Sequence, residues 1–180
     1  LVTCSYSGPL VPPNQLVHLP GPLQTCAAGQ NCDFPIPAAP NLPQTAGDIT
    51  VNGQSGDVSL APGEYRNVTV ANGKALILTK GTYVLNSVNI TAQGQIVVAS
   101  GPVTIKLAGQ GLSGNPPVVW NMQGNAAIVT MTNHPKDFMV VYGGSGDIVL
   151  QGGISTYAVV YAPNAAVKAT GGTHWYGALV

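Results

Sequence analysis

The sequence predicts an all-β fold, a right-handed parallel β-helix (β-solenoid) over residues 47–180 with about 19–20 residues per coil. Three observations lead to this prediction. An apolar–polar–apolar triplet recurs as ITV at 49–51, VTV at 68–70 and VNI at 88–90. A glycine-containing turn follows each triplet, and no stretch has the periodicity of an amphipathic helix. The expected hand follows from the preference of parallel strands for right-handed crossovers.

Two further strands are expected in each coil, which makes three short strands separated by turns. In the first half, Leu76 and Leu78 align with Ile96 and Val98, and GTYVL at 81–85 aligns with GPVTI at 101–105. In the second half, VTM at 129–131 aligns with IVL at 148–150 and with VKA at 167–169. FMVVY at 138–142 aligns with YAVVY at 157–161. Alternate apolar residues are expected to face a shared core, and the polar residues between them to face outward. Because one coil cannot close its own core, the coils must stack through parallel strand pairs.

The repeat loses phase between Ala108 and Pro117, in the segment AGQGLSGNPP. The triplets at 88–90 and 129–131 are about two coils apart. The stack is therefore expected to persist there, with one loop projecting from it. Projecting loops of solenoids often carry binding surfaces.

Residues 1–46 hold most of the prolines and are expected to form an extended N-terminal arm that packs against the solenoid. A flexible linker is the alternative. All three cysteines, Cys4, Cys26 and Cys32, lie in this arm. Their spacing matches no zinc motif, so a disulfide is expected, with its pairing open and one thiol left over; reduced thiols are the alternative. No cofactor is expected.

The composition is unusually poor in charge. Charged residues make up 7% of the chain, with six basic and six acidic side chains. The basic residues are scattered singly, whereas phosphate binding needs clustered Lys and Arg, so no nucleic-acid partner is expected. No apolar run is long enough for a membrane span. The abrupt start LVTCSYSGPL, without an initiator Met, is interpreted as a processed or trimmed start, since exported proteins lose their targeting segment.

No group of side chains points to catalysis. The acidic residues are spread along the chain, and Asp48, Asp57 and Asp147 each follow a glycine, where aspartate commonly closes a turn with its own backbone. The histidines have no metal-binding spacing, and no serine or cysteine lies in a nucleophile motif. The chain is therefore not expected to be an enzyme.

Aromatic residues recur in the second half of the chain. Tyr142 and Tyr161 share one phase of the repeat, and Phe138, Tyr157 and Tyr176 share another. Such ladders usually contribute packing, but an exposed aromatic row also offers a surface on which sugar rings stack. Tyr142 and Tyr161 are therefore the candidate glycan contacts.

Two asparagines lie in glycosylation motifs, Asn67 in NVT and Asn89 in NIT. Both are expected to face outward. They are acceptors only in a cell that carries the glycosylation machinery.

The C-terminal segment THWYGALV begins another coil. Ala178, Leu179 and Val180 align with residues 159–161. The last strand of a sheet has unpaired N–H and C=O groups, which soluble solenoids usually cover with a cap, and this segment contains none. These three residues are therefore the candidate assembly end. The alternative is that the natural chain continues beyond Val180.

The segments LAPGEYRNVTVANGKALILTKGTYVLNSVNI and YAVVYAPNAAVKATGGTHWYGALV resemble the uncharacterised β-solenoid domains of exported bacterial proteins, often associated with type IV pilus assembly or other surface structures. The resemblance implies an extracellular or cell-surface part and supplies no catalytic residues. We therefore expect a structural protein, a subunit of a surface filament or pilus-like assembly, that associates with itself or with other surface proteins. A carbohydrate-binding or adhesive module with a polysaccharide partner is the alternative.

Overall fold

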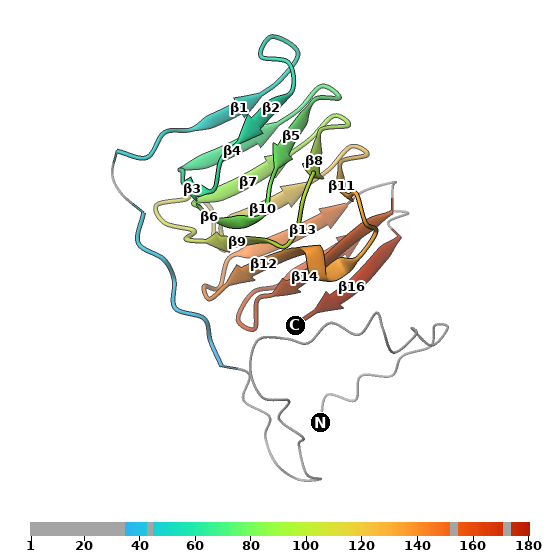
Figure 1. Cartoon of the computed structure of the whole chain (residues 1–180). Helices are drawn as coiled ribbons and strands as arrows, with labels where there is room; N and C mark the ends of the chain where they lie inside the picture. The colour runs from blue at the N-terminus through green and yellow to red at the C-terminus, as the bar shows by residue number, and fades with distance from the viewer. Residues whose placement is uncertain (1–34, 43–44, 152–154, 171–173) are drawn as a thin grey trace.

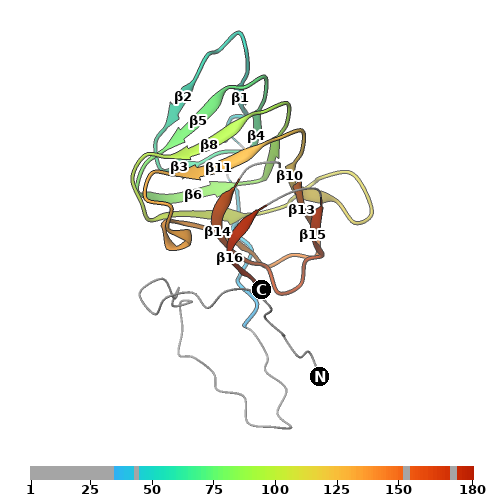
Figure 2. The same ribbon diagram turned by 90° about the vertical axis from the view of Figure 1, so that its right-hand side faces the viewer.

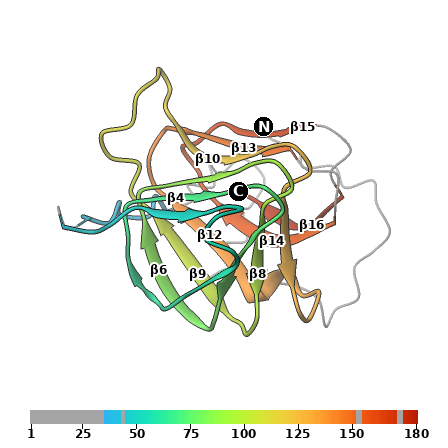
Figure 3. The ribbon, with the colours of Figure 1, turned by 90° about the horizontal axis from the view of Figure 1, so that it is seen from above.

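The chain folds into a stack of short strands arranged in three parallel sheets (Figure 1). The structure, a computed structural model, describes residues 35–42, 45–151, 155–170 and 174–180. Seen along the stack, the strands lie on the sides of a prism around one interior (Figure 3). The predicted parallel β-helix is thereby confirmed. In the described part of the chain, no helix is long and apolar enough to cross a membrane.

Each sheet is built from strands that are far apart in the sequence. Sheet A contains β1 (Ile49–Val51), β4 (Asn67–Val70), β7 (Ser87–Ile90), β10 (Val118–Met122), β13 (Asp147–Gln151) and β15 (Val167–Thr170). Sheet B contains β2 (Val58–Leu60), β5 (Ala75–Leu78), β8 (Gln95–Val98) and β11 (Ala127–Thr130). Sheet C contains β3 (Gly63–Glu64), β6 (Gly81–Leu85), β9 (Val103–Leu107), β12 (Phe138–Tyr142), β14 (Thr156–Tyr161) and β16 (Trp175–Leu179).

Successive strands define six coils. Coils 1 to 4 each run through sheets A, B and C, and they begin with β1, β4, β7 and β10. Coil 5 contains β13 and β14, and coil 6 contains β15 and β16. In the described residues sheet B ends at β11, so the last two coils continue sheets A and C only (Figure 2). A single 3-10 turn in the described chain, η2 (Pro135–Asp137), lies next to β14 and β16.

Alternation within each strand creates the core. In β4, Val68 and Val70 are buried while Asn67 and Thr69 are half-exposed. The turn that follows has positive φ at Asn72 (57°) and at the next glycine (66°), a conformation that Asn and Gly adopt readily. Sequence alternation and turn chemistry therefore agree on where the strand ends.

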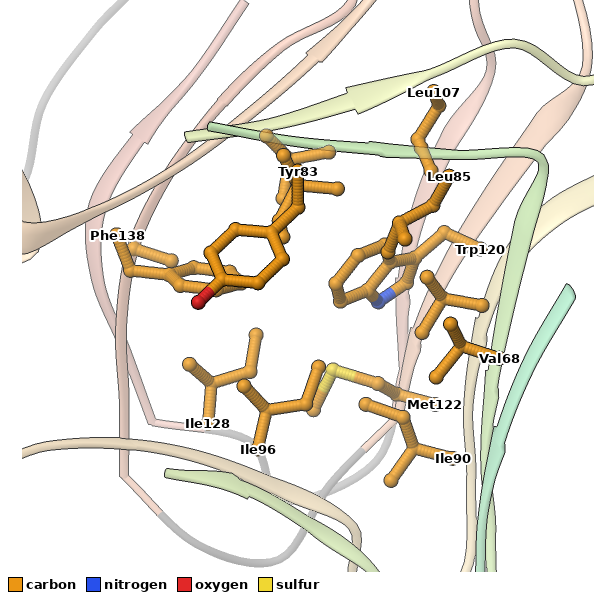
Figure 4. Packing of buried hydrophobic residues seen from close by; sticks show 14 of the residues in the cluster. Val68, Tyr83, Leu85, Ile90, Ile96, Leu107, Trp120, Met122, Ile128 and Phe138 are labelled. Carbon is orange, nitrogen blue, oxygen red and sulfur yellow. The ribbon is translucent and has the colours of Figure 1, made fainter. Parts of the chain in front are cut away.

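Aromatic side chains pack in the interior that the three sheets share. Trp120 and Phe138 meet edge to face at a centroid distance of 6.3 Å, with aliphatic side chains from all three sheets around them (Figure 4). The hydroxyl of buried Tyr83 donates to the carbonyl oxygens of Leu60 and Thr79, at 3.0 Å in each case. The hydrogen bond to Leu60 joins coil 2 to coil 1 at the corner between sheets B and C, and the one to Thr79 lies within coil 2.

The predicted registers are correct in the first coils of sheets A and B. Val68 pairs with Ile49 and with Val88 in sheet A, and Leu76 pairs with Ile96 in sheet B. The expected loop also projects between β9 and β10. After it the coil resumes at β10, where Trp120 pairs with Val88.

The alignment of VTM, IVL and VKA was wrong in its first member. Residues 127–130 form β11 of sheet B, whereas residues 147–151 form β13 of sheet A. The true sheet A strand of coil 4 is VVWNM, which the repeat pattern missed. The long loop before it displaces this strand from the regular interval.

Two predicted registers in sheet C were also wrong. Gly81 pairs with Val103 instead of Gly101, because the connection from β8 to β9 is longer than that from β5 to β6. Val141, and not Tyr142, pairs with Tyr161. The second error is a shift by one residue, which reverses the face on which a side chain lies.

Residues 35–42 of the expected N-terminal arm extend along the side of the solenoid (Figure 1). They pass the corner where sheet C connects to sheet A. The Tyr161 hydroxyl in coil 5 donates to the Pro35 carbonyl oxygen (2.6 Å), and Gln110 Nε2 donates to the Pro40 carbonyl oxygen (3.1 Å).

Candidate functional site

The aspartates that follow glycines serve as links between coils. Asp48 Oδ1 accepts hydrogen bonds from the backbone N–H and Nδ2 of Asn67, at 3.1 Å each. Asp57 Oδ1 accepts from the Ala75 N–H at 2.9 Å. The predicted contact with their own backbone was therefore wrong, because each carboxylate reaches the next coil.

A third aspartate, Asp147, is buried and forms an ion pair with Lys168 of coil 6 at 2.5 Å. Across the described residues, no three His, Cys, Asp or Glu side chains gather as a metal site. These three aspartates thus have structural partners in the neighbouring coil.

The candidate glycan pair Tyr142 and Tyr161 does not form a ladder. Tyr142 is buried, and its hydroxyl accepts a hydrogen bond from the Gly146 N–H at 3.1 Å. Tyr161 faces outward on β14. Because of the one-residue shift between β12 and β14, the two rings lie on opposite faces of sheet C, and Tyr142 cannot contact a surface glycan.

An aromatic pair does form at the other predicted phase. Tyr157 pairs with Tyr176, and their rings stack with a centroid distance of 4.7 Å and an interplanar angle of 12°. Tyr176 is exposed. Phe138 does not join them, since it lies in the core.

The predicted assembly end lies on β16 and the residue after it. Leu179 pairs with the fully buried Val160, so its side chain continues an interior row, yet it is 42% exposed. Ala178 and Val180 are half-buried on the other face of the strand. The apolar interior of the solenoid thus reaches the surface at coil 6.

Next to this side chain, the backbone of β16 has N–H and C=O groups that no strand of the described chain pairs with. The Val180 N–H donates to the Val160 carbonyl (2.9 Å), and the Ala162 N–H donates to the Val180 carbonyl (2.6 Å). Since successive residues of a strand direct these groups to opposite edges, the N–H and C=O of Leu179 point away from β14. Within the described residues, no strand pairs with that edge.

A glycine allows β16 to approach its neighbour. A Cβ on Gly177 would overlap the carbonyl oxygen of Ala158, and its φ of 147° is one that other residues rarely adopt. In the sequence WYGAL, the glycine therefore allows the close contact with Ala158, and larger side chains precede and follow it.

The opposite end of the stack is more closed. The Asn52 side chain accepts hydrogen bonds from the N–H groups of Gln54 (2.9 Å) and Ser55 (3.2 Å), which makes a compact turn after β1. The Tyr65 ring packs over Gly63, and its hydroxyl donates to the Ala61 carbonyl at 2.9 Å. Tyr65 thus covers part of the interior at coil 1.

Both glycosylation candidates belong to side-chain networks on the outer face of sheet A. Besides Asp48, Asn67 contacts Ser87, whose hydroxyl donates to Asn67 Oδ1 at 2.8 Å. Asn89 Oδ1 accepts from Asn121 Nδ2 at 2.8 Å. Their modification stays a prediction. The disulfide candidates Cys4, Cys26 and Cys32 lie outside the described residues.

Three residues that the sequence analysis did not select occupy positions of structural importance: Asn86, Gln110 and Gly143. Asn86 is buried and binds the base of the projecting loop. Gly143 and Gln110 contact residues 35–42. The turn glycines in YGGSGD and AGQG could have pointed to Gly143 and Gln110, whereas the repeat pattern contains no signal for Asn86.

A family model described as a domain of unknown function, DUF7305, matches residues 41–180. Neither a curated protein nor a solved structure matches the chain.

Proposed function

We propose, from the geometry of the chain, that this member of the DUF7305 family, a domain of unknown function, is a structural subunit whose copies add head to tail at coil 6. The observation that carries this proposal is Leu179, an exposed member of the interior row on a strand edge whose outward N–H and C=O groups pair with no described strand. Exposed edges of this kind add strands from other chains.

The occupant that fits this edge is coil 1 of a second copy. All strands of sheets A and C are parallel, so a second copy stacked beyond coil 6 would continue both sheets in the same direction. Its β1 would follow β15, and its β3 would follow β16. The half-buried apolar side chains of Ile49 and Tyr65 in coil 1 would then cover the exposed interior row at Leu179 and Ala169.

Two further features favour this contact. The chain has equal numbers of acidic and basic residues and few of either, so little like-charge repulsion opposes stacking. A head-to-tail contact uses two different surfaces, and such contacts generate open filaments when the rotation does not close a ring. The proposed location outside the cell, in a surface filament or pilus-like assembly, is supported by the resemblance and by the three cysteines.

The Leu179→Lys variant is expected to remain monomeric at concentrations where the wild type forms oligomers. The ammonium group would be buried without a partner between two coils, which costs several kcal/mol. Analytical ultracentrifugation and negative-stain electron microscopy measure the outcome, with circular dichroism to establish that the β structure is intact.

The matched control for this experiment is Val118→Lys. Val118 is 43% exposed, close to the 42% of Leu179, and lies on β10, an inner strand of sheet A that pairs with β7 and β13. This variant should assemble like the wild type. A wild-type protein that stays monomeric at high concentration, or a Leu179→Lys variant that still assembles, would refute the proposal.

A second candidate function, glycan binding, is favoured by the stacked pair of Tyr157 and Tyr176. Tyr176→Ala is expected to weaken binding to a glycan array by about tenfold, since one aromatic contact contributes roughly 1.4 kcal/mol. Val118→Ala, at another exposed apolar position, is the control. Equal array signals from wild type and Tyr176→Ala would exclude this site.

A further inference from the structure

Residues 35–42, here called the strap, are held in a defined site on the solenoid. The strap contacts Tyr161 in coil 5, Gly143 in the turn that precedes coil 5, and Gln110 in the projecting loop. These three residues, here called the corner site, come from separate coils. Only the stacking of those coils brings them together.

The corner site recognises backbone carbonyl groups. The Tyr161 hydroxyl donates to the Pro35 carbonyl oxygen at 2.6 Å, and Gln110 Nε2 donates to the Pro40 carbonyl oxygen at 3.1 Å. Between these hydrogen bonds, the Pro37 carbonyl lies against Gly143, where any Cβ would overlap it. The absence of a side chain at Gly143 is therefore what admits the strap.

The burial of the strap follows the period of a polyproline II helix. Pro37 and Pro40 are half-buried, and the two alanines between them are exposed. A spacing of three residues places both prolines on the same face of such a helix. The sequence Pro-Ala-Ala-Pro is thus bound as a Pro-x-x-Pro segment, the form that aromatic and polar grooves select from proline-rich peptides.

The strap is weakly attached in comparison with the coils. Pro35, Ile36, Ala38, Ala39 and Asn41 are exposed, and Ile36 is 60% exposed. A segment with few buried apolar contacts opens locally at low cost. Opening the strap would free the corner site without disturbing any strand pair, because the strap belongs to no sheet.

We propose that the corner site is a receptor for a Pro-x-x-Pro segment, occupied here by the chain's own strap and able to bind the strap of a second copy. The recognised groups are carbonyl oxygens and prolines, which any copy of the chain presents identically. The exchange is independent of the coil 6 contact, and it goes beyond the proposed head-to-tail assembly by linking copies through their N-terminal segments.

The site itself is tested with a labelled peptide of sequence DFPIPAAPNL, residues 33–42, added to the full chain. A variant with Pro35→Gly, Pro37→Gly and Pro40→Gly has a more flexible strap, which competes less well for the site. We expect it to bind the peptide about tenfold more tightly than the wild type does. In the wild type the attached strap competes at an effective concentration that is about millimolar for short flexible linkers.

Variants of the corner site should abolish this gain. Gly143→Ala and Tyr161→Phe, each added to the strap variant, are expected to weaken peptide binding by about tenfold or more. Gly53→Ala and Tyr157→Phe are the matched controls, because a Cβ on Gly53 meets no atom within 4 Å and Tyr157 lies on the same strand as Tyr161. Equal binding by corner-site and control variants would overturn the receptor assignment.

Exchange between copies is tested by mixing two variants of the full chain, each of which also carries Leu179→Lys so that the coil 6 contact cannot join them. Gly143→Ala keeps an intact strap but blocks its own site, and the strap variant keeps an intact site. We expect native mass spectrometry to detect mixed dimers that neither variant forms by itself. Peptide binding without mixed dimers would overturn the exchange, while loss of peptide binding would overturn the site, and neither result depends on assembly at Leu179.

Discussion

Replacing Trp120 with alanine is expected to lower the free energy of unfolding by about 3–5 kcal/mol. The indole is 1% exposed and meets Phe138 edge to face, in the part of the core shared by all three sheets (Figure 4). Its strand, β10, is the first after the projecting loop, and it pairs with β7 on one side and β13 on the other. The cavity left by the alanine would therefore weaken the junction between the first three coils and the last three.

Denaturant unfolding followed by circular dichroism measures this loss. Trp175→Ala is the matched control, because its side chain is only half-buried against the core in coil 6. Its expected cost is about 1–2 kcal/mol. Similar losses for the two tryptophans would contradict the central role assigned to Trp120.

The fold could be predicted because each strand combines a two-residue alternation with a turn. Val68 and Val70 alternate with polar residues, and the Asn-Gly turn after them fixes the end of the strand. The turns differ in length, with six residues between β1 and β2 and four between β4 and β5, but coils 1 and 2 have nearly the same total length, so the triplets recur after 19 and 20 residues. The triplets of β1, β4 and β7 therefore pair as the sequence indicated.

Registers failed where connections change length. Between β8 and β9 the chain has four residues, Ala99 to Pro102, whereas only Thr79 and Lys80 separate β5 from β6. No periodic pattern can represent such a change, because the extra residues are turn residues like any others. For the same reason, the repeat pattern did not predict β10, which follows the projecting loop.

The candidate site was less predictable than the fold. The exposed end at Leu179 followed from the repeat, but Tyr142 was assigned to the surface because a shift of one residue in sheet C exchanges inside for outside. The corner site could not be found from the sequence at all. Gly143 and Tyr161 become neighbours of the strap only through the stacking of coils.

One buried asparagine connects several of these features. Asn86 Nδ2 donates to the Gln110 carbonyl (3.0 Å) and to Asn67 Oδ1 (3.2 Å), and Asn86 Oδ1 accepts from the Gln110 N–H (2.7 Å). Gln110 in turn donates from Nε2 to the strap at Pro40. Asn86 therefore anchors the projecting loop and the outer network of sheet A directly, and it anchors the strap through Gln110.

Asn86→Ala is accordingly expected to lower the free energy of unfolding by about 2–4 kcal/mol, because three hydrogen bonds are lost and the backbone groups of Gln110 lose their partner. Gln123→Ala, at an exposed side chain, should change stability by less than about 0.5 kcal/mol. Hydrogen–deuterium exchange should also become faster in residues 108–117 before it changes in the strands of coils 1 and 2. If the loop keeps its protection in Asn86→Ala, it is held by other contacts. The coupling from Asn86 through Gln110 to the strap would then be wrong.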